Sequence, residues 1–491
     1  MAPFPLSSGR VDAGQTANLM NVHHSFFITA TLGFLALTGC SVGPNYERPV
    51  VAAPAFKETG EWKPAEPSEQ IARGKWWEAY GDPVLNGLED RVEVSSATLQ
   101  IAEARFRQAQ AAATIARSPL FPSLNATGSA DRGKSSARSS NGGVTQNTFG
   151  AGLEANWEFD IWGRVRRSAQ AGQAFAEAGA ADLESARLSL HASLAQTYFS
   201  LRVADTQQSL YSRIIADYTR SLKMTQNRYT QGIDTRVDVA TAETQLKSAQ
   251  AQAIDLSLTR SQLEHAIAIL LGQPPATFSL APADLTLSPP PTPAQIPSQQ
   301  LERRPDIASA ERQLAAASAE IGVAKAGYFP VLSLSGSAGY QSSRYQNLFN
   351  SPNEIWSLGA SALMPLFNAG KVKAGVAQAR AAYDEALGNY RQTVLAAFQE
   401  VEDNLAATNL LASEAKIQSE AVDAARQSAV ITLNQYKAGT VSYLNVVVAQ
   451  SAQLNAERAA AEILGRRLNA SVVLFKAAGG TWNTPENPVK H

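Results

Sequence analysis

Two regions of the chain alternate apolar and polar residues with a period of two, which is the side-chain repeat of a β-strand. Each region lies between a proline and a glycine, and they predict one β-hairpin at about residues 123–161 and another at about 330–368. Polar turns are expected near 132–146 and 342–354. The alternating apolar positions are Phe149, Ala151, Leu153, Ala155, Trp157 and Phe159 in the first hairpin, and Leu332, Leu334, Gly336, Ala338, Tyr340, Trp356, Leu358, Ala360, Ala362, Met364 and Leu366 in the second.

The residues after each hairpin predict long helices. No proline follows the glycine at the end of either hairpin for about a hundred residues, and an internal proline would cost a helix about 3 kcal/mol. The aligned glycine at the next turn, Gly232 in the first copy and Gly439 in the second, comes 69 residues later in both cases. A helix of that length extends roughly 100 Å, so it must pair with another helix along its length. We interpret the heptad-like stripes as core packing rather than a cofactor site; they are Leu183, Leu190, Leu194 and Leu201, then Leu256, Leu263, Ile267 and Leu270.

The hairpins and helices recur at an offset of 207 to 208 residues, which indicates a tandem duplication. The aligned pairs include Gly163 with Gly370, Gly232 with Gly439, Gly272 with Gly479, and Tyr229 with Tyr436. Gly232 and Gly439 are expected to form the tips of two helical hairpins.

The duplication predicts the organisation of the chain. A first repeat is expected at 84–272, a Pro-rich linker at 273–303, a second repeat at 304–480 and a short polar tail at 481–491. The linker and the residues before Val84 are predicted to be extended surface connections.

The N-terminus has the features of a secretion signal that ends in a lipid attachment site. Residues 26–37 form an apolar core too short to span a membrane, and small residues separate it from Cys40, the only cysteine. We predict a signal peptide at 1–39, with Met20 as a natural start, and a lipid-anchored extended segment at 40–83. The string around Cys40 resembles the bacterial lipobox, which implies a covalent diacylglycerol and an N-acyl chain on this residue. The alternative is a buried free thiol.

Composition and motifs give no support for an enzyme. A net charge of −1 provides no basic field for nucleic acid, and one cysteine with five histidines gives no metal-ligand spacing. The run from Gly128 to Ser135 fits the P-loop pattern, but a flexible loop rather than a helix is expected after it. His191 and His265 each lie alone in a helical stretch, so packing or surface positions are favoured over catalysis. No cofactor, metal site or catalytic residue is predicted.

The four predicted strands have the length and alternation of outer-membrane β-strands. Four strands cannot close into a barrel, and an open edge in lipid would leave backbone groups without hydrogen bonds. Several chains must therefore pool their strands, and three copies are the simplest number that leaves a lumen. The competing interpretation is a soluble sandwich of two hairpins.

Four strings resemble the outer membrane factor family, the TolC-like channels with their NodT lipoprotein branch. They lie at residues 40–49, 76–85, 159–164 and 304–307. The resemblance implies a mixed α and transmembrane β fold, in which a homotrimer forms a twelve-stranded β-barrel in outer-membrane lipid, continued by a twelve-helix periplasmic α-barrel. It also implies an exit duct for small molecules such as drugs, joined by a periplasmic adaptor (membrane fusion) protein to an inner-membrane transporter of the resistance-nodulation-division (RND) type.

In that family the helical tips close the periplasmic end and contact the adaptor. Here the tips are about 228–243 and 435–450, with Gly232 and Gly439 at the turns. The resemblance makes Asp234, Arg236, Asp238, Tyr436, Val441 and Asn445 candidate aperture residues. Asn445 and Val448 stand where many relatives carry acidic residues, so the gate is expected to depend more on packing or hydrogen bonds. The alternative is that the charged tip residues only cap helices and face solvent.

Three other functions remain open on sequence grounds. Within the channel class, the alternatives are a duct for type I protein secretion and a duct for metal efflux. In another class, a lipid-anchored coiled-coil scaffold would account for the helices but not for four alternating strands.

Overall fold

The computed structural model describes residues 41–49, 74–138, 142–291 and 304–480. The chain divides into two compact units, each formed from three separate stretches. The first comprises Met1–Tyr46, Ala112–Gln173 and Ala316–Tyr383, and the second comprises Glu47–Ala111, Ala174–Ala315 and Asp384–His491.

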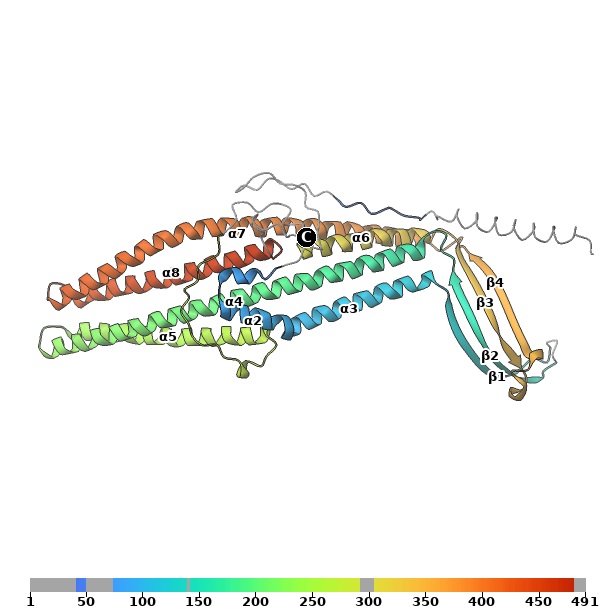
Figure 1. Cartoon of the computed structure of the whole chain (residues 1–491), viewed down its shortest axis with the longest axis horizontal. Coiled ribbons are helices and arrows are strands. Elements are labelled where there is room, and N and C mark those ends of the chain that lie inside the picture. Colours follow the sequence, from blue (N-terminus) through green and yellow to red (C-terminus); the bar gives the residue numbers. More distant parts are fainter. Residues whose placement is uncertain (1–40, 50–73, 139–141, 292–303, 481–491) are drawn as a thin grey trace, which may run out of the picture. The chain divides into compact units, whose positions relative to one another are not determined.

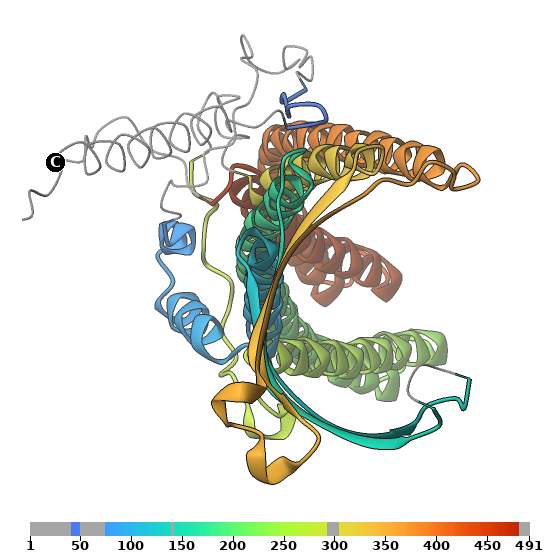
Figure 2. The same ribbon diagram turned by 90° about the vertical axis from the view of Figure 1, so that its right-hand side faces the viewer.

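The first unit contains one antiparallel sheet in the order β1-β2-β3-β4. Its strands are β1 (Ser123–Lys134), β2 (Thr145–Glu158), β3 (Val331–Ser342) and β4 (Glu354–Leu363). The strands lie side by side and curve together as a single layer (Figures 1 and 2). The two predicted hairpins are confirmed, and β2 with β3 joins them into one sheet.

The helices recur with the predicted period. The helices α4 (Arg164–Thr230) and α7 (Lys371–Lys437) are each 67 residues long, and α5 (Arg236–Leu270) and α8 (Tyr443–Ala477) are each 35 residues long. Figure 1 shows α4 beside α5 and α7 beside α8. Shorter helices precede each hairpin, namely η1 (Trp76–Tyr80), α2 (Pro83–Ser95) and α3 (Ala97–Arg117) in the first repeat and α6 (Pro305–Ala326) in the second.

Glycines with positive φ mark the same turns in both repeats. Gly232 and Gly439, at the helical tips, have φ of 76° and 78°, a region that residues with a Cβ atom rarely adopt. Two further pairs also have positive φ. Gly163 and Gly370 precede α4 and α7, and Gly272 and Gly479 follow α5 and α8. The aligned glycines therefore form positive-φ turns at equivalent points of the two repeats.

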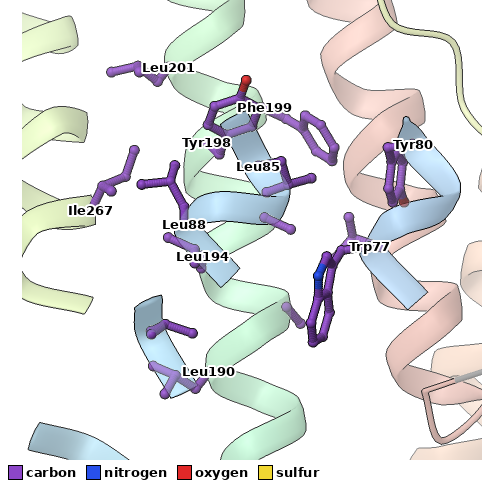
Figure 3. Close-up of a cluster of buried hydrophobic side chains, with 14 of the residues drawn as sticks. Trp77, Tyr80, Leu85, Leu88, Leu190, Leu194, Tyr198, Phe199, Leu201 and Ile267 are labelled. Carbon is purple, nitrogen blue, oxygen red and sulfur yellow. The ribbon is translucent and has the colours of Figure 1, made fainter. Parts of the chain in front are cut away.

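Among the described residues, an extensive apolar core lies in the second unit. Trp77, Tyr80, Leu85 and Leu88 pack against a face of α4 that carries Leu190, Leu194, Tyr198, Phe199 and Leu201, with Ile267 of α5 opposite (Figure 3). Three of the predicted leucines, Leu190, Leu194 and Leu201, are at most 5% exposed. The interpretation of the leucine stripes as core packing is confirmed.

Two predicted surface connections contribute to this core. Residues Trp76–Tyr80 form a 3₁₀ helix, and both tryptophans and the tyrosine are buried. In the linker, Phe278 and Leu285 are buried, and Arg202 donates a hydrogen bond of 2.8 Å to the Ala281 carbonyl. The prediction of purely surface segments is therefore wrong here, because their aromatic and aliphatic side chains cover the long helices.

The structure revises one local prediction and agrees with another. The last strand ends at Leu363, before Met364 and Leu366, because Pro365 cannot donate a ladder hydrogen bond. The sequence argued against a nucleotide site at the P-loop pattern, and the structure agrees, since Gly128–Lys134 lies inside β1 and pairs with β2. Among the described residues, every helix is too short or too polar to cross a membrane.

Candidate channel elements

One face of the sheet is apolar across all four strands. Directly paired residues share a face, and one such row is Leu124, Ala155, Gly336 and Leu358, while the next is Ala126, Leu153, Ala338 and Trp356. Leu358 is 82% exposed and Trp356 is 72% exposed. A continuous exposed face of this kind matches the lipid-facing side of a membrane strand.

The opposite face is polar. One row contains Asn125, Glu154, Ser337 and Ser357, and the hydroxyl oxygens of the two serines lie 2.8 Å apart. Thr127, Ser129 and Asp131 follow Asn125 on the same face of β1. This face can line water, as the lumen side of a barrel does.

Two glycines allow the central strands to approach closely. Gly152 of β2 and Gly339 of β3 are paired, and a Cβ atom on Gly339 would lie 2.4 Å from the Ala151 carbonyl oxygen. A Cβ atom on Gly152 would lie 2.9 Å from the Ala338 carbonyl oxygen. Without side chains at these two positions, the backbones of β2 and β3 can lie in contact in the middle of the sheet. A larger residue at either position would prevent this contact.

The start of α4 anchors the first described residues. The Asp160 carboxylate accepts hydrogen bonds from the backbone N–H groups of Val165 and Arg166, as an N-terminal cap does. Val42 N–H donates to the Trp162 carbonyl at 3.0 Å. A Cβ atom on Gly322 of α6 would lie 2.9 Å from the Val42 carbonyl oxygen. The segment after Cys40 is thus held where β2 gives way to α4.

At the helical tips, Asp234 links the two hairpins. Its carboxylate pairs with Arg228 Nε at 3.1 Å and accepts a hydrogen bond from the Tyr436 hydroxyl. The Asp234 side chain is only 8% exposed, and Tyr436 is 1% exposed. The Arg228 guanidinium lies 4.8 Å from the centre of the Tyr436 ring, a cation–π arrangement.

The buried phenol of Tyr436 remains a donor over the whole physiological range. Burial, together with the hydrogen bond to Asp234, raises the pKa of Tyr436 to about 12. Its ring packs edge-on against Tyr443 with centroids 5.4 Å apart, and Ala242, Val446 and Val441 complete the contact. Asp234 and Tyr436 therefore connect the first tip to an apolar cluster that includes the second.

The other candidate residues at the first tip have different environments. Asp238 forms a capping box with Thr235, in which each side chain bonds the other residue's backbone N–H. Arg236 is exposed and sits at the first position of α5. The capping alternative therefore describes Asp238, whereas Asp234 has the cross-hairpin role.

At the second tip, Asn445 is exposed and its amide lies 3.4 Å from the Ser442 hydroxyl. Several apolar side chains near both turns are also exposed: Ile233, Val237, Leu444 and Val448.

Sequence reasoning missed Arg228 and Tyr443. Comparison of the two repeats offers a signal for Tyr443. It lies four residues after Gly439, whereas the residue four positions after Gly232 is Arg236, so the second tip alone has an aromatic side chain here. Cys40 lies outside the described residues. No cluster of His, Cys, Asp or Glu that could hold a metal ion occurs in the described ranges.

The chain has a sheet with one apolar and one polar face, and two helices of 67 residues, each paired with a helix of 35 residues. These elements define a channel protein that spans a membrane with strands. Residues 88–273 and 296–480 match the family model described as outer membrane efflux protein. The chain belongs to this family.

Characterised relatives cover nearly the same length. The pyoverdine export outer membrane protein OpmQ of Pseudomonas aeruginosa is 34% identical over 84% of this chain and 88% of its own length. The solvent efflux pump outer membrane protein SrpC of Pseudomonas putida is 32% identical over 92% of this chain and 98% of its own.

Solved structures agree with the fold. The outer-membrane channel OprN superimposes with a TM-score of 0.83 at 31% identity, covering 90% of this chain and all of that one. The Neisseria gonorrhoeae channel MtrE gives a TM-score of 0.75 at 29% identity, with 90% of this chain and 98% of that chain covered. The protein is an outer membrane channel component of an efflux system, as its sequence motifs predicted.

Proposed function

We propose that three copies of the chain assemble into one duct. Within the described residues, β1 and β4 each pair on one side only, so each copy presents two open strand edges. Joining β1 of one copy to β4 of the next satisfies these edges, and four strands per copy give a twelve-stranded barrel. The continuous apolar face is the observation that carries this proposal.

Cys40 anchors each copy to the membrane through a diacylglycerol and an N-acyl chain. The residues just after it, Ser41 to Asn45, are held at the junction of β2 and α4. Because strands end there and a long helix begins, the junction is the place where a barrel would leave the bilayer. A lipid attached at Cys40 then inserts at that same surface.

The helical tips close the inner end of the duct. The hydrogen bond from Tyr436 to Asp234, supported by Arg228, holds the two hairpins of one copy together in the closed form. Exposed Ile233, Val237, Leu444 and Val448 supply apolar area for contacts with neighbouring copies and with a periplasmic adaptor.

The duct passes small molecules delivered by an inner-membrane RND transporter through that adaptor. The names of relatives that export pyoverdine or extrude solvents and toluene support this class of cargo. The chain itself carries out no chemical reaction, and the transporter supplies the energy.

A complementation experiment tests this function. In a strain that lacks its own exit duct, the protein is produced with its cognate adaptor and transporter, and accumulation of a hydrophobic dye is measured. We expect lower accumulation than with the assembly-defective variant Gly339→Val. Equal accumulation in both strains would contradict the exit-duct proposal.

A further inference from the structure

In the second unit, an imidazole ring on α4 lies between two carboxylates that both belong to α2. His191 of α4 places Nδ1 2.6 Å from Glu89 Oε2 and Nε2 3.0 Å from Glu93 Oε2. Glu89 is fully buried and His191 is 4% exposed. The second oxygen of Glu89, Oε1, is buried and has no hydrogen-bond partner among the described residues. The channel function described above uses none of these groups.

The surroundings of this cluster are well defined. Trp77 of η1 stacks on the His191 ring with centroids 4.4 Å apart. On α4, Arg187 Nε lies 3.0 Å from Glu93 Oε1, and Arg187 also pairs with Glu184. On η1 and α2, the remaining charges are Asp82, which caps α2 and accepts a hydrogen bond from the Tyr198 hydroxyl, Asp90, which pairs with Lys75 at 2.7 Å, and the exposed Glu78 and Arg91.

The two carboxylates require a proton that a neutral imidazole cannot supply. A neutral imidazole has one N–H donor, whereas both nitrogens of His191 face a carboxylate oxygen. Both hydrogen bonds exist if the ring is an imidazolium or if one carboxyl is protonated, and the two forms contain the same number of protons. Removal of that proton leaves a nitrogen lone pair against a carboxylate in a buried site, which is repulsive.

We propose that Glu89, His191 and Glu93 form a proton-binding lock that fastens residues 76–95, the η1–α2 clamp, to α4, and that loss of the shared proton at alkaline pH loosens the clamp. The clamp also reaches α8, because Trp76 stacks on Phe475 and the Tyr80 hydroxyl lies 2.6 Å from the Ser471 hydroxyl. Fastening the clamp therefore ties the first helical hairpin to the second.

The direction of the pH effect follows from the burial of Glu89. Desolvation raises the pKa of Glu89 to about 7, and the hydrogen bond to His191 offsets only part of this rise. The docked clamp thus holds a proton that an exposed Glu89 would release, so docking is strongest at acid pH and is lost progressively as the pH rises through about 7.

Hydrogen exchange of the intact protein in detergent tests the lock. Peptides covering α2 are followed by mass spectrometry at pH 5.5 and pH 8.5, with rates corrected for intrinsic exchange. We expect the opening equilibrium of α2 to increase roughly 30-fold at the higher pH, because a docked Glu89 with a pKa of about 7 keeps its proton for about 1.5 pH units above pH 5.5. Glu89→Gln reproduces the protonated carboxyl and should keep α2 protected equally at both pH values.

The matched control is Glu78→Gln, which removes an exposed carboxylate of η1 outside the cluster. It should retain the pH dependence of the natural sequence. Three results would overturn the proposal: equal protection of the natural sequence at both pH values, a pH dependence that persists in Glu89→Gln, or loss of α2 protection in Glu89→Gln at both.

Discussion

Replacing Tyr436 by phenylalanine tests the tip hydrogen bond with little change in packing. The variant keeps the aromatic ring against Tyr443 but removes the hydroxyl that donates to Asp234. A hydrogen bond to a charged group contributes about 1.5–3 kcal/mol, and burial of both partners places this one within that range. Since 1.4 kcal/mol corresponds to a factor of ten, the ratio of closed to open tips should fall about 10- to 100-fold per copy.

Single-channel recording in planar lipid bilayers measures this ratio directly. We expect Tyr436→Phe to spend more time in conducting states than the natural protein. Tyr229→Phe is the matched control, because Tyr229 is an exposed tip tyrosine and its loss should leave the open fraction unchanged. An unchanged open fraction in Tyr436→Phe, with correct assembly, would refute the assignment of this hydrogen bond to closure.

Two glycine substitutions test the sheet and the N-terminal segment. Gly339→Val places side-chain carbon 2.4 Å from the Ala151 carbonyl oxygen, so the variant should fail to form a heat-resistant oligomer on gels, and normal assembly would show that the strands tolerate a wider spacing. Gly322→Val clashes with the Val42 carbonyl oxygen and should expose residues 41–46 to added protease. Gly375→Ala, a helical glycine with no atom within 4 Å of the added Cβ, should stay resistant; equal cleavage of both variants would contradict the docking of this segment.

Local periodicity made the strands and long helices predictable. The residues from Phe149 to Trp157 alternate because one side of the strand faces away from the lumen. The aligned glycines recur because equivalent turns in the two repeats have a positive φ. The duplication strengthened both predictions, since each element appeared twice in the sequence.

Long-range contacts could not be predicted in the same way. Tyr436 and Asp234 are 202 residues apart, and His191 and Glu89 are 102 residues apart, so nothing in the neighbouring sequence reveals either partner. Trp76 and Trp77 lie in a segment too short to show a period, and their burial depends on α4 and α8. Asp238 was a candidate aperture residue, yet its local pattern with Thr235 already matched a capping box.

The most direct test of the trimeric duct is the native mass of the protein extracted from outer membranes in detergent, with the mass of its N-terminal peptide read from the same sample. Three chains, each beginning at an acylated Cys40, are the predicted result. A monomer that begins at an unmodified Cys40 would contradict both the shared barrel and the lipid anchor.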